Sequence, residues 1–272
     1  MKNNMITFIG GGNMASSLIG GLIETGVAID QIRVADPDVQ PLAAQWKVRC
    51  DTNNLTAIEG SDVVVLAVKP QILPDVAKSI ATALPTNPPL FISIVAGVRI
   101  ADIARWLGAD LPIVRVMPNM PALVRSGASA LFAGEQVSDS QRELAESILR
   151  AVGLTLWLEE ETQMDAVTAL SGSGPAYFFL IMEMLEKAAC ALGLPQESAR
   201  LLTLQTAFGA AKMALESQED AATLRARVTS KGGTTEEAIN TLQAGGLQPL
   251  FDQALYAAQQ RAISLAKQFG EQ

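Results

Sequence analysis

The sequence predicts an α/β chain in which an open sheet with helices on both faces is followed by an all-helical part. Two observations support this. In the first part, short β-rich runs alternate with amphipathic helical stretches, which is the pattern of a parallel sheet. From Glu159 onward, Ala, Leu, Gln and Glu dominate and no strand pattern occurs. We place the domain boundary between residues 160 and 161, because Glu159–Glu161 puts negative charge at a helix N-terminus.

Each strand of the first part is predicted from a short apolar run. Val63–Val68 has no polar alternation, as expected for a strand that is covered on both sides. Amphipathic helices are predicted between the strands, for example at Ala15–Thr25 and Gln141–Val152. The predicted strands are Met5–Gly10, Ile32–Ala35, Val63–Ala67, Leu90–Ile94, Ile113–Met117, Ala128–Ala133 and Leu154–Leu158.

Turn signals divide the second part into about five helices. They lie at Ser171–Pro175, Gly193–Pro195, Ser230–Thr235 and Ala244–Gly246.

The composition excludes several kinds of chemistry. The chain has 272 residues and no histidine, so a Ser-His-Asp triad, a Cys-His dyad and a histidine zinc site are impossible. We predict no metal site, and we expect chemistry that uses a cofactor, carboxylates, hydroxyls, lysines or backbone amides. The net charge of −8 argues against a nucleic-acid partner.

The sequence favours a cytoplasmic location. Cys50 and Cys190 lie far apart without a CxxC motif, which is typical of free thiols in a reducing compartment. The N-terminus shows no signal-peptide pattern. The most membrane-like stretch, residues 176–192, carries Glu183, Glu186 and Lys187, so we expect no membrane partner.

A glycine-rich turn follows the first predicted strand. Gly10–Ala15 matches G-x-G-x-x-A between a strand and a helix, which indicates an N-terminal Rossmann-type dinucleotide-binding domain. Gly10 permits a tight turn, and Gly12 lets a pyrophosphate approach the backbone amides of the helix N-terminus. The alternative is a glycine turn without a nucleotide. The predicted cofactor-binding residues of this turn are Gly10, Gly11, Gly12, Asn13 and Met14.

Asp36 ends the second predicted strand, 21 residues after Ala15. Dinucleotide enzymes place a carboxylate there to accept hydrogen bonds from the ribose hydroxyls. A carboxylate favours NADH over NADPH because it repels a 2′-phosphate. The alternative is that Asp36 only stabilises an Asp-Pro-Asp turn, and both interpretations stay open.

Residues after other strands are predicted to complete the cofactor site, because ligands bind beyond the carboxyl ends of parallel strands. Lys69 either faces a ribose or phosphate or is solvated. Gly97 forms either part of the site wall or an ordinary turn, and Asn119 either contacts the nicotinamide region or stabilises its turn. The full additional set is Asn54, Ala67, Val68, Lys69, Pro70, Ala96, Gly97 and Asn119.

The stretch Ser230–Thr235 predicts an anion site in the helical part. Gly232 and Gly233 expose backbone amides just before a helix, and Thr234-x-x-Glu237 matches a capping box. A small carboxylate suits such a site. The alternative is an ordinary turn between helices with a normal cap.

Five motifs in order give the chain a resemblance to the pyrroline-5-carboxylate reductase family, from residue 5 to about residue 265. The resemblance implies reduction of a small-molecule substrate, 1-pyrroline-5-carboxylate, to L-proline with NADPH or NADH. It also implies a C-terminal dimerisation domain and a homodimer, which in many members assembles into a decamer, a pentamer of dimers. The motifs are Gly10–Ala15, Ala67–Pro70, Arg115–Ala122, Ser171–Tyr177 and Val228–Thr235.

The resemblance also implies roles for the anion turn. It places Ser230, Gly232, Gly233 and Thr234 around the substrate carboxylate, and the Thr235 hydroxyl near the imine nitrogen as the catalytic group. The chain departs from the family pattern at two positions: Met120 stands where Thr is usual and Lys231 where Pro is usual.

The sequence also bears on two rival functions, a β-hydroxyacid dehydrogenase and a regulatory protein. A β-hydroxyacid dehydrogenase needs a lysine four residues after a Gly-Ser-Gly turn, and Phe178 occupies that position. A redox-sensing regulatory protein would bind the dinucleotide without catalysis and would need no anion turn.

Overall fold

The chain divides into two compact units in the computed structural model, which describes residues 4–38 and 45–271. The first unit comprises Met1–Ser173 together with Ala257–Gln272, and the second comprises Gly174–Tyr256. The boundary that we predicted between residues 160 and 161 stays a prediction.

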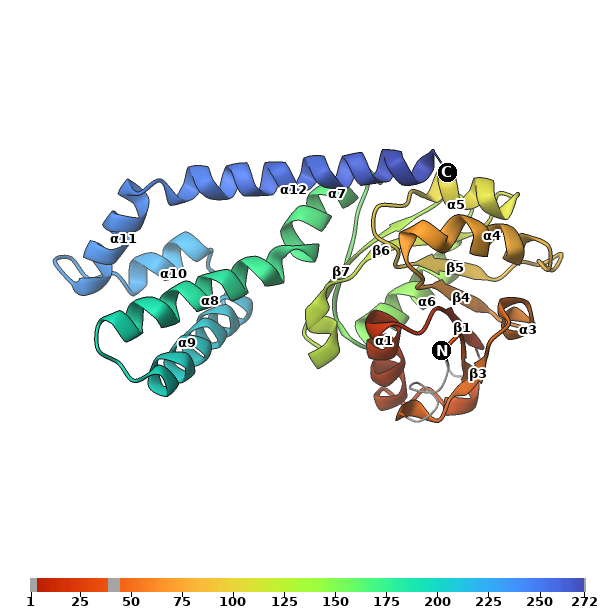
Figure 1. Cartoon of the computed structure of the whole chain (residues 1–272), viewed down its shortest axis with the longest axis horizontal. Coiled ribbons are helices and arrows are strands. Elements are labelled where there is room, and N and C mark those ends of the chain that lie inside the picture. Colours follow the sequence, from red (N-terminus) through yellow and green to blue (C-terminus); the bar gives the residue numbers. More distant parts are fainter. Residues whose placement is uncertain (1–3, 39–44, 272) are drawn as a thin grey trace. The chain divides into compact units, whose positions relative to one another are not determined.

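One mixed sheet forms the centre of the first unit (Figure 1). Within the described residues it has eight strands in the order β3-β2-β1-β4-β5-β6-β7-β8. Every neighbouring pair is parallel except β6 and β7, which are antiparallel. The strands are β1 (Ile6–Ile9), β2 (Ile32–Ala35), β3 (Arg49–Asp51), β4 (Val63–Leu66), β5 (Leu90–Ser93), β6 (Ile113–Met117), β7 (Gly127–Ala133) and β8 (Gly153–Trp157).

Two details differ from the sequence-based expectation. The edge strand β3 was not predicted, because its three residues, Arg-Cys-Asp, show no apolar run. The sheet is also not wholly parallel. The connection between Met117 and Gly127 is too short for a crossover helix of ordinary size, so β7 returns antiparallel to β6.

Helices cover both faces of the sheet, which confirms the predicted α/β class. On one face, α1 (Asn13–Glu24) and α6 (Asp139–Arg150) bury their apolar sides against Phe8 and Ile92. On the other, α3 (Asn54–Ile58), α4 (Leu73–Ala81) and α5 (Ile100–Leu107) pack with Leu66 and Phe91. Alternate residues of each strand therefore enter two separate cores.

A buried ion pair joins the sheet to the chain that follows β8. The Arg115 side chain on β6 is almost fully buried, and its Nη1 lies 2.9 Å from Oε1 of Glu161. The same oxygen accepts a hydrogen bond from the Ile100 amide at the start of α5. After Glu161 come α7 (Gln163–Val167) and a π-helical turn (Thr168–Gly172). Short 3₁₀ turns lie at Ile29–Gln31, Pro70–Ile72 and Met120–Val124.

The second unit is helical, as predicted. It contains α8 (Gly174–Ala191), α9 (Gln196–Glu216), α10 (Ala221–Arg227), α11 (Thr234–Ala244) and the start of α12 (Leu247–Gly270). α8 and α9 pack against each other. Asp220 caps α10 by accepting a hydrogen bond from the Thr223 amide, and this bond lowers the pKa of the Asp220 carboxyl. The turns before α9, α11 and α12 coincide with predicted turn signals, whereas the turn at residues 217–220 between α9 and α10 was not predicted.

The last helix is shared between the two units. From Ala257 onward α12 belongs to the first unit, where Ala262, Ala266 and Phe269 are buried. Arg105 on α5 donates a hydrogen bond to the Gly270 carbonyl and forms an ion pair with Asp102. This end of α12 is therefore held to α5 by both apolar and polar contacts.

None of the helices in the described part of the chain combines the length and the apolar character that a membrane span requires.

Candidate active site

The carboxyl ends of five neighbouring strands gather the predicted cofactor residues at one edge of the sheet. These strands, β2, β1, β4, β5 and β6, are all parallel. The Gly10 amide donates to the Ala35 carbonyl at 2.8 Å, and the Ala67 amide donates to the Ile9 carbonyl at 2.8 Å. Segments far apart in the sequence are thus brought to one place.

The glycine turn has the geometry that a dinucleotide site requires. Gly10 has a φ of +99°, and a Cβ at this position would lie 2.7 Å from the Ala67 carbonyl oxygen. A Cβ on Gly12 would meet nothing within 4 Å, so the space above this residue is open. Gly12 is the N-cap of α1 and has no side-chain cap. The first amides of α1, at Asn13 and Met14, have no acceptor within the helix and suit a pyrophosphate.

Asp36 makes the contacts of a turn residue and also touches the glycine turn. Its Oδ1 accepts a hydrogen bond from the Asp38 amide at 2.9 Å, as the Asp-Pro-Asp interpretation predicts. Its Oδ2 accepts from the Gly11 amide at 2.7 Å. The sequence pattern did not indicate this second bond, since Gly11 and Asp36 lie on different strand ends.

The other predicted cofactor residues occupy turns at the same edge. Asn54 is the first residue of α3, directly after the N-cap Asn53. Ala67, Val68 and Lys69 follow β4, and the exposed Lys69 is the N-cap of a 3₁₀ turn that begins with Pro70.

Ala96 and Gly97 form the turn after β5. Gly97 has a φ of +75°, so this turn requires a glycine. A Cβ there would be in ordinary contact with the Phe269 ring, at 3.4 Å. The end of α12 therefore packs against this turn.

Asn119 stabilises the turn after β6. Its Nδ2 lies 3.2 Å from both the carbonyl oxygen and the Oγ of Ser171, and its Oδ1 accepts from the Ala128 amide at 2.8 Å. Next to it, a Cβ on Gly172 would collide with the Met117 methyl group. Asn119 thus joins the end of β6 to the π-helical turn, a type of turn that is frequent at functional sites.

The predicted anion turn lies in the second unit, between α10 and α11. Gly232 has a φ of +71°, and the Gly233 amide donates to the Ser230 carbonyl at 3.0 Å. The predicted capping box of Thr234 and Glu237 is wrong, because Gly233 is the N-cap and has no side chain that could accept a hydrogen bond from the helix amides.

The carboxylate of Glu236 reaches back to this turn instead. Its Oε2 accepts a hydrogen bond from the Gly232 amide at 2.7 Å, so an amide of the turn already binds a carboxylate. Thr234 and Thr235 are the first two residues of α11, and Thr235 is half-buried.

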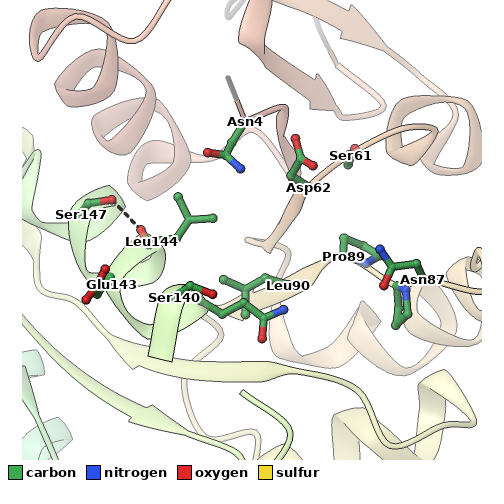
Figure 2. Close-up of a pocket in the computed structure, with 12 residues that line it drawn as sticks. Asn4, Ser61, Asp62, Asn87, Pro89, Leu90, Ser140, Glu143, Leu144 and Ser147 are labelled. Atoms are coloured by element: carbon green, nitrogen blue, oxygen red, sulfur yellow. Dashed lines mark hydrogen bonds between the residues drawn. The ribbon is translucent and has the colours of Figure 1, made fainter. Parts of the chain in front are cut away.

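A separate cavity of about 670 Å³ opens at the opposite edge of the sheet (Figure 2). Asn4, Asp62 and Leu90 line it at the amino ends of β1, β4 and β5, and Ser140 and Glu143 line it from α6. The cavity is distinct from the glycine turn, which lies beyond the carboxyl end of β1.

A doubly wound sheet with a G-x-G-x-x-A turn at its carboxyl edge, followed by a helical unit, defines a two-domain dinucleotide-dependent oxidoreductase. Comparison with known families agrees with this class. Residues 5–97 match the family described as NADP oxidoreductase coenzyme F420-dependent. Residues 161–265 match the family described as pyrroline-5-carboxylate reductase dimerisation.

Similar proteins narrow the class to one family. The pyrroline-5-carboxylate reductase of Pseudomonas aeruginosa is 51% identical, with 100% of both chains covered. The structure of the Coxiella burnetii reductase is 48% identical, covers 97% of this chain and 98% of that one, and has a TM-score of 0.93. The structure of the Plasmodium falciparum pyrroline carboxylate reductase with NADP bound is 28% identical and has a TM-score of 0.87. The match covers 98% of this chain and 99% of that one. The chain belongs to the pyrroline-5-carboxylate reductase family.

Proposed function

We propose that this protein reduces 1-pyrroline-5-carboxylate to L-proline with NADPH or NADH, the last step of proline synthesis. The observation that carries the proposal is the full-length similarity to the Pseudomonas aeruginosa reductase, at 51% identity. This similarity favours the reductase over a regulatory protein without catalysis.

The first unit holds the coenzyme in this proposal. The amides of Gly12, Asn13 and Met14 bind the pyrophosphate, because the turn leaves open space above Gly12. Gly11, whose amide donates to Asp36, shapes this turn. Asp36 and Asn54 lie towards the adenosine ribose. The walls of the coenzyme site are formed by the strand-end turns Ala67–Pro70 and Ala96–Gly97. Asn119 contributes to the site by stabilising the turn after β6. When bound, the nicotinamide supplies a hydride to the carbon of the substrate C=N bond.

The second unit holds the substrate carboxylate. Ser230, Gly232, Gly233 and Thr234 surround it with amides and hydroxyls at the N-terminus of α11. The bond between the Gly232 amide and Glu236 supports this assignment, because it places a carboxylate on the turn. When the substrate binds, its carboxylate replaces Glu236 as the acceptor of the hydrogen bond from that amide.

Thr235 is the proposed catalytic residue. Its hydroxyl hydrogen-bonds the imine nitrogen, which must hold one proton when the hydride reaches the adjacent carbon. A cyclic imine is basic enough to arrive protonated or to receive this proton through the hydroxyl from water, so no histidine is needed. The protein accelerates the reaction mainly by holding the two reacting carbons in position.

The assembly proposed for this chain is a homodimer formed through the helical unit, with a decamer of five dimers as its larger form. The match of residues 161–265 to the dimerisation family supports the dimer. We place the protein in the cytoplasm, since proline synthesis draws on the reduced coenzymes found there.

The purified protein tests this function directly. The absorbance of NADH and of NADPH is followed separately, with and without pyrroline-5-carboxylate, and the product is assayed for L-proline. We expect the coenzyme to be consumed only when the imine is present, with one L-proline formed per coenzyme oxidised. Coenzyme binding without any consumption would contradict the proposal and would favour the regulatory protein.

A further inference from the structure

The anion turn, Ser230–Thr235, begins with a four-residue β-turn that contains Lys231. The Gly233 amide donates to the Ser230 carbonyl at 3.0 Å, and Gly232, the third residue, has a φ of +71°. A positive φ at the third position is typical of a type II turn, whose second position favours proline because the ring fixes φ. Lys231 occupies that second position. The turn is therefore less rigid than one with proline, and it carries a positive charge instead.

A glutamate of α11 occupies the amide that follows Lys231. Glu236 Oε2 accepts a hydrogen bond from the Gly232 amide at 2.7 Å. This amide nitrogen is bonded directly to the Lys231 carbonyl carbon, so the carboxylate lies against the backbone of Lys231. A hydrogen bond to a charged acceptor is about twice as strong as a neutral one. The binding of a substrate carboxylate in place of Glu236 must therefore compensate for the loss of a strong bond.

The charges next to this amide oppose the binding of an anion. Glu236 and Glu237 both lie in the first turn of α11, and the whole chain has a net charge of −8. A displaced Glu236 stays close to the incoming carboxylate, because both groups use the same amide. Two carboxylates at such close range repel each other unless a cation pairs with one of them.

Lys231 is the cation that is nearest to this amide in the sequence, and its side chain is exposed. It forms no ion pair with any residue in the described part of the chain. The preceding cations, Arg225 and Arg227, lie in the last turn of α10, and Arg227 is paired with Glu219 at 2.7 Å. A lysine has a flexible four-carbon stem and a compact ammonium group, so it can reach a carboxylate beside its own peptide group.

We propose that Lys231 and Glu236 form an exchange pair that sets the affinity for the substrate carboxylate. The Gly232 amide binds Glu236 in the structure. When a substrate carboxylate takes that amide, the Glu236 carboxylate moves to the Lys231 ammonium group. Lys231 thus keeps the displaced charge paired and lets a turn beside two glutamates accept an anion. This inference rests on the proposed function, because it assigns a specificity-determining role to two further residues of the same carboxylate site.

Steady-state kinetics with pyrroline-5-carboxylate tests the exchange at an ionic strength of about 0.01 M, where screening is weak. Lys231→Gln is expected to raise KM about fivefold, the upper range for an exposed ion pair, and to change kcat by less than about twofold. Lys231→Arg keeps the charge and should keep KM within about twofold of the wild-type value. At about 1 M salt the effect of Lys231→Gln should fall below about twofold, which a merely structural role of the residue would not produce.

A double-mutant cycle separates the exchange from a direct attraction between Lys231 and the substrate. In Glu236→Gln protein no charge is displaced, so adding Lys231→Gln should raise KM less than about twofold. Glu237→Gln is the matched control, because Glu237 lies in the same turn of α11 but is not bonded to the Gly232 amide. In that protein Lys231→Gln should keep its effect of about fivefold. Arg225→Gln removes another exposed cation near the turn and should leave KM within about twofold of the wild-type value.

Several results would overturn the exchange: an unchanged KM in Lys231→Gln, an equal rise of KM with and without Glu236, or an equal effect of Arg225→Gln. A wild-type protein that oxidises neither coenzyme with the imine contradicts the proposed function instead. Calorimetry with L-proline, which carries the same carboxylate, then still tests the exchange. The Kd of Lys231→Gln should be about fivefold above that of the wild type, and an equal Kd or no binding by the wild type would overturn the proposal.

Discussion

Thr235 is the residue on which the proposed chemistry depends most. It is half-buried at the second position of α11, at the end of the anion turn Ser230–Thr235. In a chain without histidine, a hydroxyl is one of the few groups that can both donate to and accept from a nitrogen. The sequence pattern located this turn, but it assigned the cap to the wrong residues.

We expect Thr235→Ala to lower kcat/KM for pyrroline-5-carboxylate about 100-fold, because the imine nitrogen loses its hydrogen-bonding partner. Thr235→Ser should restore most of the activity, and the Kd for NAD⁺ should stay unchanged in both variants. Steady-state kinetics and calorimetry measure these effects.

The control for this experiment is Thr241→Ala, the same substitution further along α11. The exposed Thr241 hydroxyl donates only to the Glu237 carbonyl, and its loss should leave kcat/KM at the wild-type value. If Thr235→Ala had the kinetics of Thr241→Ala, Thr235 would have no part in the mechanism.

The C-terminal end of α12 shows how one element supports a site built from others. Phe269 is buried and touches the turn at Gly97, while Arg105 holds the carbonyl of the following residue, Gly270. The periodicity of the sequence predicts a helix here but not its docking site, because the two contacting segments are more than 150 residues apart.

We expect Phe269→Ala to lower the free energy of unfolding by about 3 kcal/mol, since it leaves a cavity in the core shared by α5 and α12. Urea unfolding followed by circular dichroism measures the change. Gln268→Ala, at the exposed preceding position, is the matched control and should change stability by about 0.5 kcal/mol or less. Equal effects of the two substitutions would show that the end of α12 is not docked in this way.

The helical unit leaves a large apolar surface exposed on a single chain. In α8, Gly174 is the only buried residue, and Phe178 and Leu185 are 64% and 55% exposed. A monomer seldom exposes so many large apolar side chains together. The match of this region to the dimerisation family supports an oligomer, and we expect a second copy of the chain to cover these side chains.

We expect light scattering at micromolar concentration to give a mass of at least two chains of 28.7 kDa. Phe178→Glu should lower this mass, because it buries an unpaired charge in the contact between copies. Glu183→Gln, on the same helix, should leave the mass unchanged. A monomeric wild-type protein would contradict the prediction.

Local patterns in the sequence were sufficient for the α/β class, the glycine turn and the helical second part. Strand and helix periodicities and glycine positions with a required backbone shape act over a few residues, so they can be recognised without a structure. The family resemblance added the reaction and the substrate. The short strand β3 escaped prediction because an edge strand of three residues has almost no pattern.

The contacts between distant segments became known only from the folded chain. The bond from Gly11 to Asp36 joins two strand ends, the side chain of Asn119 is occupied by Ser171 and Ala128, and Phe269 packs on the turn at Gly97. Such contacts depend on the order of the strands and on the rotation of single side chains. The order of residues along the chain therefore specified the kind of site, while three-dimensional packing decided which of its polar groups are already engaged.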